Sequence, residues 1–266
     1  MRLKDRIAIV VGAGQSPGEG MGNGRATALT FAREGAKVLC VDRDLTSAQE
    51  TVDMIAAKDG TAAAFKADVT KDAEIKAMVS DAMKRWGRID VLHNNVGVSL
   101  AGGDAELLSI SEEAFDRCVA INLKSCILAA KHVIPIMRQQ KSGAIINISS
   151  MAAITTYPYV AYKATKSAMI AFTEQLAYQN AQYGIRANVI LPGLIDTPMA
   201  VDTRARVSGK NRAEVAAARD ARVPLRRKMG TAWDVANAAL FLASDEANFI
   251  TGVALPVDGG ALVNIN

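Results

Sequence analysis

Short apolar runs alternate with helical patterns along the whole chain. The runs lie at residues 7–11, 37–41, 89–92, 144–148 and 186–191, and a last strand is expected before Gly259. Continuous runs of this length are typical of strands that are buried on both faces of a parallel sheet. Helical patterns such as 25–34 lie between them. The alternation predicts a doubly wound α/β fold in which right-handed crossovers connect the parallel strands.

A glycine-rich segment follows the first run. That run ends at Gly12, and further glycines stand at positions 14, 18, 20, 22 and 24 before the helical pattern. Glycine lets the backbone approach a pyrophosphate, and a helix amino end offers free N–H groups, so the segment predicts a Rossmann-like nucleotide site. Pro17 occupies the third glycine position of G-x-G-x-x-G, and anchoring the motif at Gly12, Gly22 and Gly24 leaves a loop about six residues longer than needed. The alternative is a flexible surface loop.

A carboxylate stands where the second strand ends. Asp42 lies about twenty residues beyond the glycines, where this fold holds a ribose 2′-hydroxyl. A carboxylate there repels a 2′-phosphate, which favours NAD over NADP. Arg43 weakens that preference because a guanidinium tolerates the extra phosphate. Asp42 can also cap a turn or helix before Leu45, and both roles can coexist.

Tyr162 and Lys166 stand at i and i+4, which places them on one face of a helix. Lowering the pKa of a tyrosine from ~10 to near 7 needs about 4 kcal/mol. An ammonium ~5 Å away at an effective dielectric of ~20 supplies about 3 kcal/mol, and an oxidised nicotinamide supplies the rest. We therefore expect the pair to move a proton beside a redox coenzyme. The same spacing also fits a tyrosine packed beside a surface lysine.

These motifs resemble those of the short-chain dehydrogenase/reductase family, in its shorter single-domain branch, over almost the whole chain. Other segments match in order: Asp68-Val69, Asn94-Asn95-Val96-Gly97, Ile121-Asn122-Leu123, Pro192 through Thr197, and Ile250 through Gly260. Val96 replaces the alanine of the family pattern, which should only tighten packing.

The resemblance implies hydride transfer between NAD(H) and a secondary alcohol or ketone. Tyr162 is the implied acid and base, Lys166 lowers its pKa and holds the ribose, and Ser150 binds the substrate oxygen. Asn122 kinks a helix and holds a relay water. The implied cofactor contacts are Gly12, Gly14, Gly22, Asn23, Asp42, Arg43, Asp68, Val69, Asn95, Gly97, Tyr162, Lys166, Ile195 and Thr197. No metal is expected.

Two serines compete for the catalytic position. Ser149 lies thirteen residues before Tyr162, the spacing usual in the family. In the family's Asn-Ile-Ser-Ser string, however, the second serine points into the site, which selects Ser150. Ser149 is then expected to end the strand with its side chain on the opposite face.

Length and composition fit one domain spanning residues 1–266. Half of the 266 residues are hydrophobic, enough for a substantial core. No long apolar segment is expected to span a bilayer, and the amino terminus lacks the core of a signal peptide, so we expect a cytoplasmic protein. Cys40, Cys118 and Cys126 are expected to be reduced packing residues. The net charge of +4 does not suggest nucleic acid.

Basic residues gather between Arg204 and Lys228, where the family carries its variable substrate lid, here at about 197–230. They are Arg204, Arg206, Lys210, Arg212, Arg219, Arg222, Arg226, Arg227 and Lys228, against Glu214 and Asp220. One hypothesis is that the lid attracts an anionic substrate, such as a carboxylate or an acyl group on a phosphorylated carrier. The alternative that we favour is a solvated helical face or a subunit contact.

Other functions remain open. A 3-oxoacyl-thioester reductase shares the fold and the catalytic residues, but such reductases usually draw on NADPH, which Asp42 disfavours. A non-catalytic dinucleotide sensor is expected to have lost part of the Ser–Tyr–Lys set. An epimerase of the longer branch needs a C-terminal domain for which the chain leaves no room.

Pocket walls are expected after Gly97, at 151–159 and from Met199. Helices around 122–140 and 159–183 carry more small and apolar residues than one face against the sheet needs, and the resemblance implies that they pair across a subunit interface in a homodimer or homotetramer.

Overall fold

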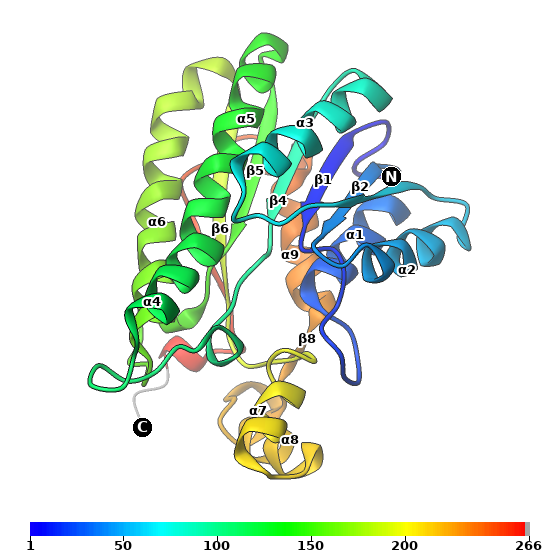
Figure 1. Ribbon diagram of the computed structural model, residues 1–266. Coiled ribbons are helices and arrows are strands. Elements are labelled where there is room, and N and C mark those ends of the chain that lie inside the picture. The colour runs from blue at the N-terminus through cyan, green and yellow to red at the C-terminus, as the bar shows by residue number, and fades with distance from the viewer. Residues whose placement is uncertain (264–266) are drawn as a thin grey trace.

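The architecture is a parallel sheet between two layers of helices, seen in a computed structural model that describes residues 1–263 (Figure 1). In this part of the chain seven strands pair in the order β3-β2-β1-β4-β5-β6-β9, all parallel. The strands are β1 Ile7–Val11, β2 Lys37–Asp42, β3 Thr61–Lys66, β4 Val91–Asn94, β5 Gly143–Ile148, β6 Ile185–Pro192 and β9 Ala254–Val257, with β7 Ile195–Asp196 and β8 Gly230–Thr231 pairing separately. The predicted doubly wound fold is confirmed.

Helices cover both faces of the sheet. One layer holds α1 Asn23–Arg33, α2 Leu45–Ala56 and α9 Ala232–Ala243, and the other holds α3 Asp72–Trp86, α5 Ser125–Gln140 and α6 Val160–Asn180. The alternation of β1 shows how the core divides: Ala8 and Val10 pack into the first layer, whereas Ile9 and Val11 pack into the second. Successive strand residues face opposite sides, so a strand buried on both faces must be apolar throughout.

The strand order reverses beside β1. From β1 the chain passes outward to β2 and β3, then returns to β4 on the other side. The two crossovers leave in opposite directions, which opens a crevice at the carboxyl ends of β1 and β4. The predicted motifs that follow the strands therefore lie together at the carboxyl edge of the sheet.

The continuous helix Glu112–Gln140, formed by α4 Glu112–Val119, a π-turn and α5, is long and apolar enough by composition to cross a bilayer. In the fold α5 packs beside α3, and its Ala129, Val133 and Met137 belong to the apolar core. Burial against the sheet accounts for part of its apolar surface, since 33% of the apolar window is buried.

The segment 197–230 stands apart from the layers, beyond the carboxyl edge of the sheet (Figure 1). It contains α7 Asp202–Ser208 and α8 Arg212–Asp220. A small apolar cluster of its own, built on Val201, Val223 and Met229, holds it together. It is anchored at both ends by the β7–β8 pair, where Ile195 pairs with Gly230.

Candidate functional site

Tyr162 is held in the first turn of α6 by a buried carboxylate from a distant loop. The two oxygens of Asp104 accept hydrogen bonds from the main-chain N–H groups of Ala161 at 2.9 Å and Tyr162 at 3.0 Å. Asp104 is 4% exposed and also accepts a bond from the Ser99 hydroxyl at 3.1 Å. A carboxylate at a helix amino end satisfies its unpaired N–H groups and complements its dipole. The contact fixes the position of the phenol at the carboxyl edge of the sheet.

Lys166 lies one turn further along α6, and its ammonium group is buried. The Nζ atom donates to the carbonyl oxygen of Ile148 at 2.7 Å and lies 5.8 Å from the centre of the Tyr162 ring. Only 2% of the residue is exposed, and this burial lowers the pKa of the Lys166 ammonium to about 8. A buried ammonium needs a hydrogen-bond acceptor, and the end of β5 supplies one.

The electrostatics of the phenol differ from the expectation. Burial raises the pKa of Tyr162 to about 12, the Ser150 hydroxyl and the Arg204 charge lower it, and Tyr157 and Asp104 raise it. The groups of the protein itself therefore do not depress this pKa. The physical reason is that Lys166 directs its ammonium to the Ile148 carbonyl, while burial penalises the phenolate.

The two serines after β5 point in different directions. The Ser149 hydroxyl, 3% exposed, donates to the main-chain oxygen of Lys166 at 2.7 Å. The Ser150 hydroxyl stands on the side of the phenol and accepts a bond from the N–H of Ala152 at 3.1 Å. The strand ends at Ile148, one residue earlier than expected. Of the two, Ser150 is the one that the structure brings to Tyr162.

Asn122 lies in a π-turn, Ala120–Lys124, between α4 and α5. Its Oδ1 accepts from the N–H of Val98 at 2.7 Å, and its Nδ2 donates to the Val98 oxygen at 2.9 Å and to the Thr165 hydroxyl at 3.1 Å. The fully buried side chain thus links the loop after β4 to the helix that carries Tyr162 and Lys166. π-turns of this kind occur frequently at functional sites.

The ends of the glycine segment meet as the motif requires. Gly12 has a φ of +82°, and a Cβ on Gly24 would lie 1.9 Å from the Gly12 oxygen. Only glycine allows that approach of α1 to β1. Gly22 caps α1 without a side-chain bond, and the Oδ1 of Asn23, buried, has no partner among residues 1–263. Free N–H groups at a helix start suit the pyrophosphate of a dinucleotide, and Asn23 offers a polar atom beside it.

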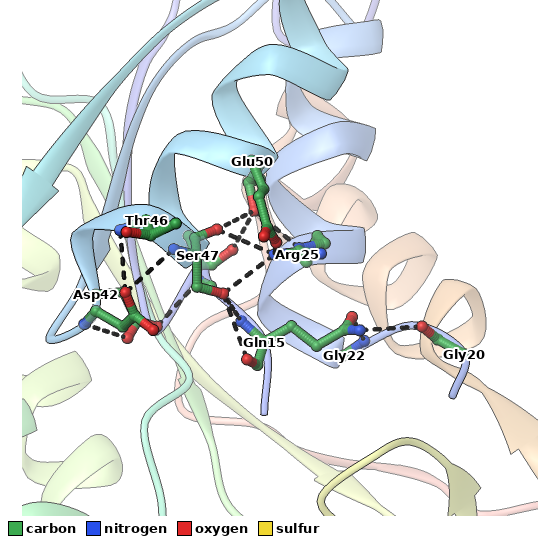
Figure 2. A network of polar contacts seen from close by, with 12 residues as sticks. Gln15, Gly20, Gly22, Arg25, Asp42, Thr46, Ser47 and Glu50 are labelled. Carbon is green, nitrogen blue, oxygen red and sulfur yellow. Dashed lines mark hydrogen bonds and ion pairs between the residues drawn. The ribbon is translucent and has the colours of Figure 1, made fainter. Parts of the chain in front are cut away.

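The extra residues of the glycine segment form a closed loop that Gln15 ties together (Figure 2). The Gln15 side chain accepts from the N–H of Gly22 at 2.9 Å and donates to the Gly20 oxygen at 3.2 Å. Its main-chain N–H donates to the Ser47 hydroxyl at 2.8 Å, and the buried Arg25 donates to the same hydroxyl at 3.1 Å. Residues 16–20 are exposed, and hydrogen bonds of Gln15 join the two ends of this surface loop.

Asp42 lies at the end of β2 against this loop (Figure 2). Its Oδ2 accepts from the N–H of Gly14 at 3.0 Å, and its Oδ1 accepts from the N–H of Asp44 at 3.1 Å. A carboxylate has about four acceptor positions, so two remain for ribose hydroxyls. Asp44, rather than Asp42, caps α2. Arg43 is exposed beside it.

The remaining predicted cofactor residues follow other strands. Asp68 lies beyond β3, where bonds from Thr70 lower its pKa, and Val69 next to it is buried. Asn95 donates to the Gly12 oxygen at 3.1 Å, and a Cβ on Gly97 would lie 3.2 Å from the Lys166 Nζ. The buried Ile195 and Thr197 stand at the start of segment 197–230. The predicted residues thus line one edge of the sheet, from β3 to β6.

The glycine loop contacts segment 197–230. The N–H of Glu19 donates to Asp202 at 3.1 Å, and Arg212 forms ion pairs with Asp196 at 2.6 Å, Asp202 at 3.3 Å and Glu19 at 3.7 Å. Arg206 donates to the Pro17 oxygen at 3.4 Å. Three carboxylates therefore surround one guanidinium where the loop meets the segment.

Arg212→Gln should loosen the loop and the segment together. Each partly exposed pair contributes about 0.2–1 kcal/mol, so losing the network should speed amide exchange about tenfold in residues 15–21 and 197–230. Exchange measured by mass spectrometry checks this, with Lys210→Gln as the control because Lys210 is exposed. Faster exchange in segment 197–230 alone would show that the loop is held independently.

Several site residues carry no sequence signal. Asp104 caps a helix that lies more than fifty residues away in sequence. Gln15 holds the glycine loop together, and Arg25 of α1 donates to the same Ser47 hydroxyl as the Gln15 main chain. Tyr157 was expected only as a pocket wall, yet its ring lies 5.4 Å from that of Tyr162. The sequence hint for Asp104 is an acidic residue directly after Gly102-Gly103, a pattern that fits many turns equally well.

Comparisons with known proteins agree with this geometry. Residues 19–261 match the family model described as enoyl-(acyl carrier protein) reductase. The chain is 35% identical over 266 residues to a 3-oxoacyl-acyl-carrier-protein reductase of Thermotoga maritima, covering 99% of this chain and 100% of that protein. It is 33% identical over 262 residues to levodione reductase of Leifsonia aquatica, covering 97% and 95%. A solved structure described as a short-chain dehydrogenase/reductase from Burkholderia xenovorans superposes with a TM-score of 0.90 at 40% identity, covering 100% of this chain and 99% of that one.

Proposed function

This chain belongs to the short-chain dehydrogenase/reductase family, oxidoreductases of CH–OH groups that use NAD(P), and on that premise we propose that it transfers a hydride between NAD(H) and a secondary alcohol or ketone. The observation that carries the proposal is the meeting of Tyr162, Ser150 and Lys166 at the crevice beside β1 and β4. A non-catalytic sensor has no need to keep all three groups.

Each catalytic group has one task. When bound, NAD⁺ accepts the hydride from the alcohol carbon. The Tyr162 oxygen takes the hydroxyl proton in oxidation and returns it in reduction, and the Ser150 hydroxyl donates to the substrate oxygen. The Lys166 ammonium holds ribose hydroxyls. The Asn122 side chain already accepts one hydrogen bond through Oδ1 and donates two through Nδ2. A relay water must therefore bind the remaining lone pair of Oδ1 or the main-chain carbonyl of Asn122.

A panel of secondary alcohols and ketones tests the proposal. Absorbance of the reduced nicotinamide should report turnover with at least one partly apolar substrate, with NAD and NADP assayed in parallel. A protein that binds NADH but turns over no member of a broad panel would favour the sensor instead.

The preference for NAD rests on Asp42. Its carboxylate is directed at the loop after β1 and has free acceptor positions, whereas Arg43 is exposed and its charge acts on Asp68. A 2′-phosphate placed there meets a fixed negative charge at close range, which costs several kcal/mol in a partly buried position.

Asp42→Asn should weaken discrimination against NADP by more than about tenfold in kcat/KM, because an amide removes the repulsion and keeps one acceptor. Activity with NAD should fall only a few-fold. Asp44→Asn, which changes the same charge at the cap of α2, serves as the control. Equal changes in both variants would assign the effect to net charge instead of to the ribose contact.

A 3-oxoacyl-thioester reductase remains the second candidate. The similarity to the Thermotoga maritima enzyme and the basic segment 197–230 support it. Adding an acetoacetyl thioester with NADPH to the panel separates the two. Faster turnover of that pair than of every alcohol with NAD would select the reductase.

Oligomeric state and location complete the proposal. We expect a homotetramer or homodimer built on α5 and α6, since Ala164, Ala171 and Tyr178 leave an exposed surface of small and aromatic residues along α6. Light scattering would test this. A cytoplasmic location is proposed because Cys40, Cys118 and Cys126 are free and buried.

A further inference from the structure

Two arginines of segment 197–230 are at least half-buried and yet have no carboxylate partner within residues 1–263. Arg219 is buried, with 9% exposed, and its Nε donates to the sulfur of Met229 at 3.3 Å. Arg204 is half-buried, and its Nη1 donates to the Ala200 oxygen at 2.8 Å. A thioether and a carbonyl carry no charge, so neither cation is neutralised by what it touches.

The nearby carboxylates are already engaged elsewhere. Asp196 pairs with Arg212 at 2.6 Å. Asp220 accepts from the Lys228 ammonium at 3.0 Å and from the N–H of Met229 at 2.8 Å. Burial, Arg204 and Arg222 lower the pKa of Arg219 to about 10, and Tyr157 and Asp196 oppose this shift. A buried cation next to like charges is unfavourable unless an anion joins it.

Segment 197–230, which carries both guanidinium groups, lies beyond the carboxyl edge of the sheet, where β5 ends before Ser150 (Figure 1). The charge of Arg204 lowers the pKa of Tyr162, and Tyr157, whose ring lies 5.4 Å from that of Tyr162, raises the pKa of Arg219. Asp42, which marks the expected adenosine end, lies on β2, beyond β1 and β4 from the strand that leads to Ser150. The two arginines therefore adjoin the substrate and not the adenosine.

We propose that Arg219 and Arg204 form a subsite for a monoanionic oxygen group, a carboxylate or a phosphodiester, that the substrate carries. Guanidinium groups bind such anions by charge-assisted, often bidentate bonds, and these are strongest where water is excluded. The identity of the ligand as substrate rests on the proposed function. The other basic residues of the segment are exposed or paired. The hypothesis that this segment attracts an anionic substrate therefore applies to Arg219 and Arg204.

Binding to the full-length protein saturated with NADH tests the subsite without turnover. The probes are butanoate, dimethyl phosphate and the neutral isostere butanamide, with dissociation constants from NMR titration. The unaltered protein should bind at least one anion about tenfold more tightly than butanamide. Arg219→Met should remove that preference, and Arg204→Met should reduce it, while butanamide and NADH bind as before. Which anion prevails tells a free carboxylate from a carrier-linked phosphodiester.

Lys210→Met is the matched control, because it removes one exposed positive charge from the same segment. It should keep the preference. Three results would overturn the subsite: no preference in the unaltered protein, equal weakening of butanoate and butanamide by Arg219→Met, or loss of preference in Lys210→Met, which indicates long-range attraction only. An intact preference in a protein that oxidises no alcohol would instead overturn the proposed function and leave the subsite in place.

Discussion

Tyr162→Phe should lower kcat by about 10³-fold or more while changing the Kd for NADH less than about threefold. Acid–base catalysis by one positioned group contributes about 10²–10⁴-fold, and phenylalanine has no proton to exchange. The ring contacts with Tyr157 at 5.4 Å survive the change, as does the Asp104 cap, which uses main-chain N–H groups. The loss should therefore appear in turnover and not in folding. Steady-state kinetics and NADH fluorescence titration measure the two quantities.

The pH profile sharpens this test. Burial raises the pKa of Tyr162 to about 12, so the phenolate is scarce near neutral pH. Alcohol oxidation needs the phenolate and should rise with pH, whereas ketone reduction needs the phenol and should not rise. Tyr178→Phe, the same chemical change at a residue that is 83% exposed on the same helix, should retain full activity. Residual Tyr162→Phe oxidation that kept the unaltered pH profile would assign the proton to another group.

The sequence predicted most where local pattern decides structure. The apolar run of β1 ends at the residue expected, because burial on both faces requires continuous apolarity. Gly12 and Gly24 were identified as anchors because few other residues fit a close backbone approach. The i, i+4 spacing correctly placed Tyr162 and Lys166 on one helix.

What escaped prediction depends on contacts between distant segments. Spacing could not tell that the Lys166 ammonium turns to the Ile148 carbonyl, since that depends on where β5 ends. The Asp104 cap and the burial of Arg219 likewise arise only when loops meet across the edge of the sheet. On the sequence alone, the basic residues of the segment are compared only with the acidic residues inside the same segment. In the structure, Arg212 is neutralised by Asp196 and Glu19, which lie outside it. Charge counts along a chain do not measure local charge in a fold.

Lys166→Met should abolish most activity and yet stabilise the protein at pH 7. Burial lowers the pKa of Lys166 from 10.5 to about 8, which corresponds to about 3 kcal/mol of destabilisation while the group is charged. Methionine has similar volume and no charge. Its one loss is the hydrogen bond to the Ile148 carbonyl, worth about 1 kcal/mol, so the net gain in unfolding free energy should be about 2 kcal/mol. Oxidation should fall at least about 10²-fold, because the ammonium proposed to hold the ribose hydroxyls, and so to position the coenzyme, is lost.

The lowered pKa of Lys166 predicts how the stability of the unaltered protein changes with pH. Between pH 8 and 10.5 the folded state binds fewer protons at this position than the unfolded state, so the unaltered protein becomes more stable as pH rises through that window. The extra unfolding free energy of Lys166→Met should therefore shrink over the same range. Subtracting the unfolding free energies of the two proteins removes the contributions of all other titrating groups, which both proteins share. Urea unfolding at pH 7, 9 and 10 measures it, with the exposed Lys131→Met as control. A difference in unfolding free energy that stayed constant across these pH values would mean that burial of the Lys166 ammonium does not destabilise the folded state. A residue that costs stability and supports turnover is expected at a functional site, where the requirements of chemistry and of folding differ.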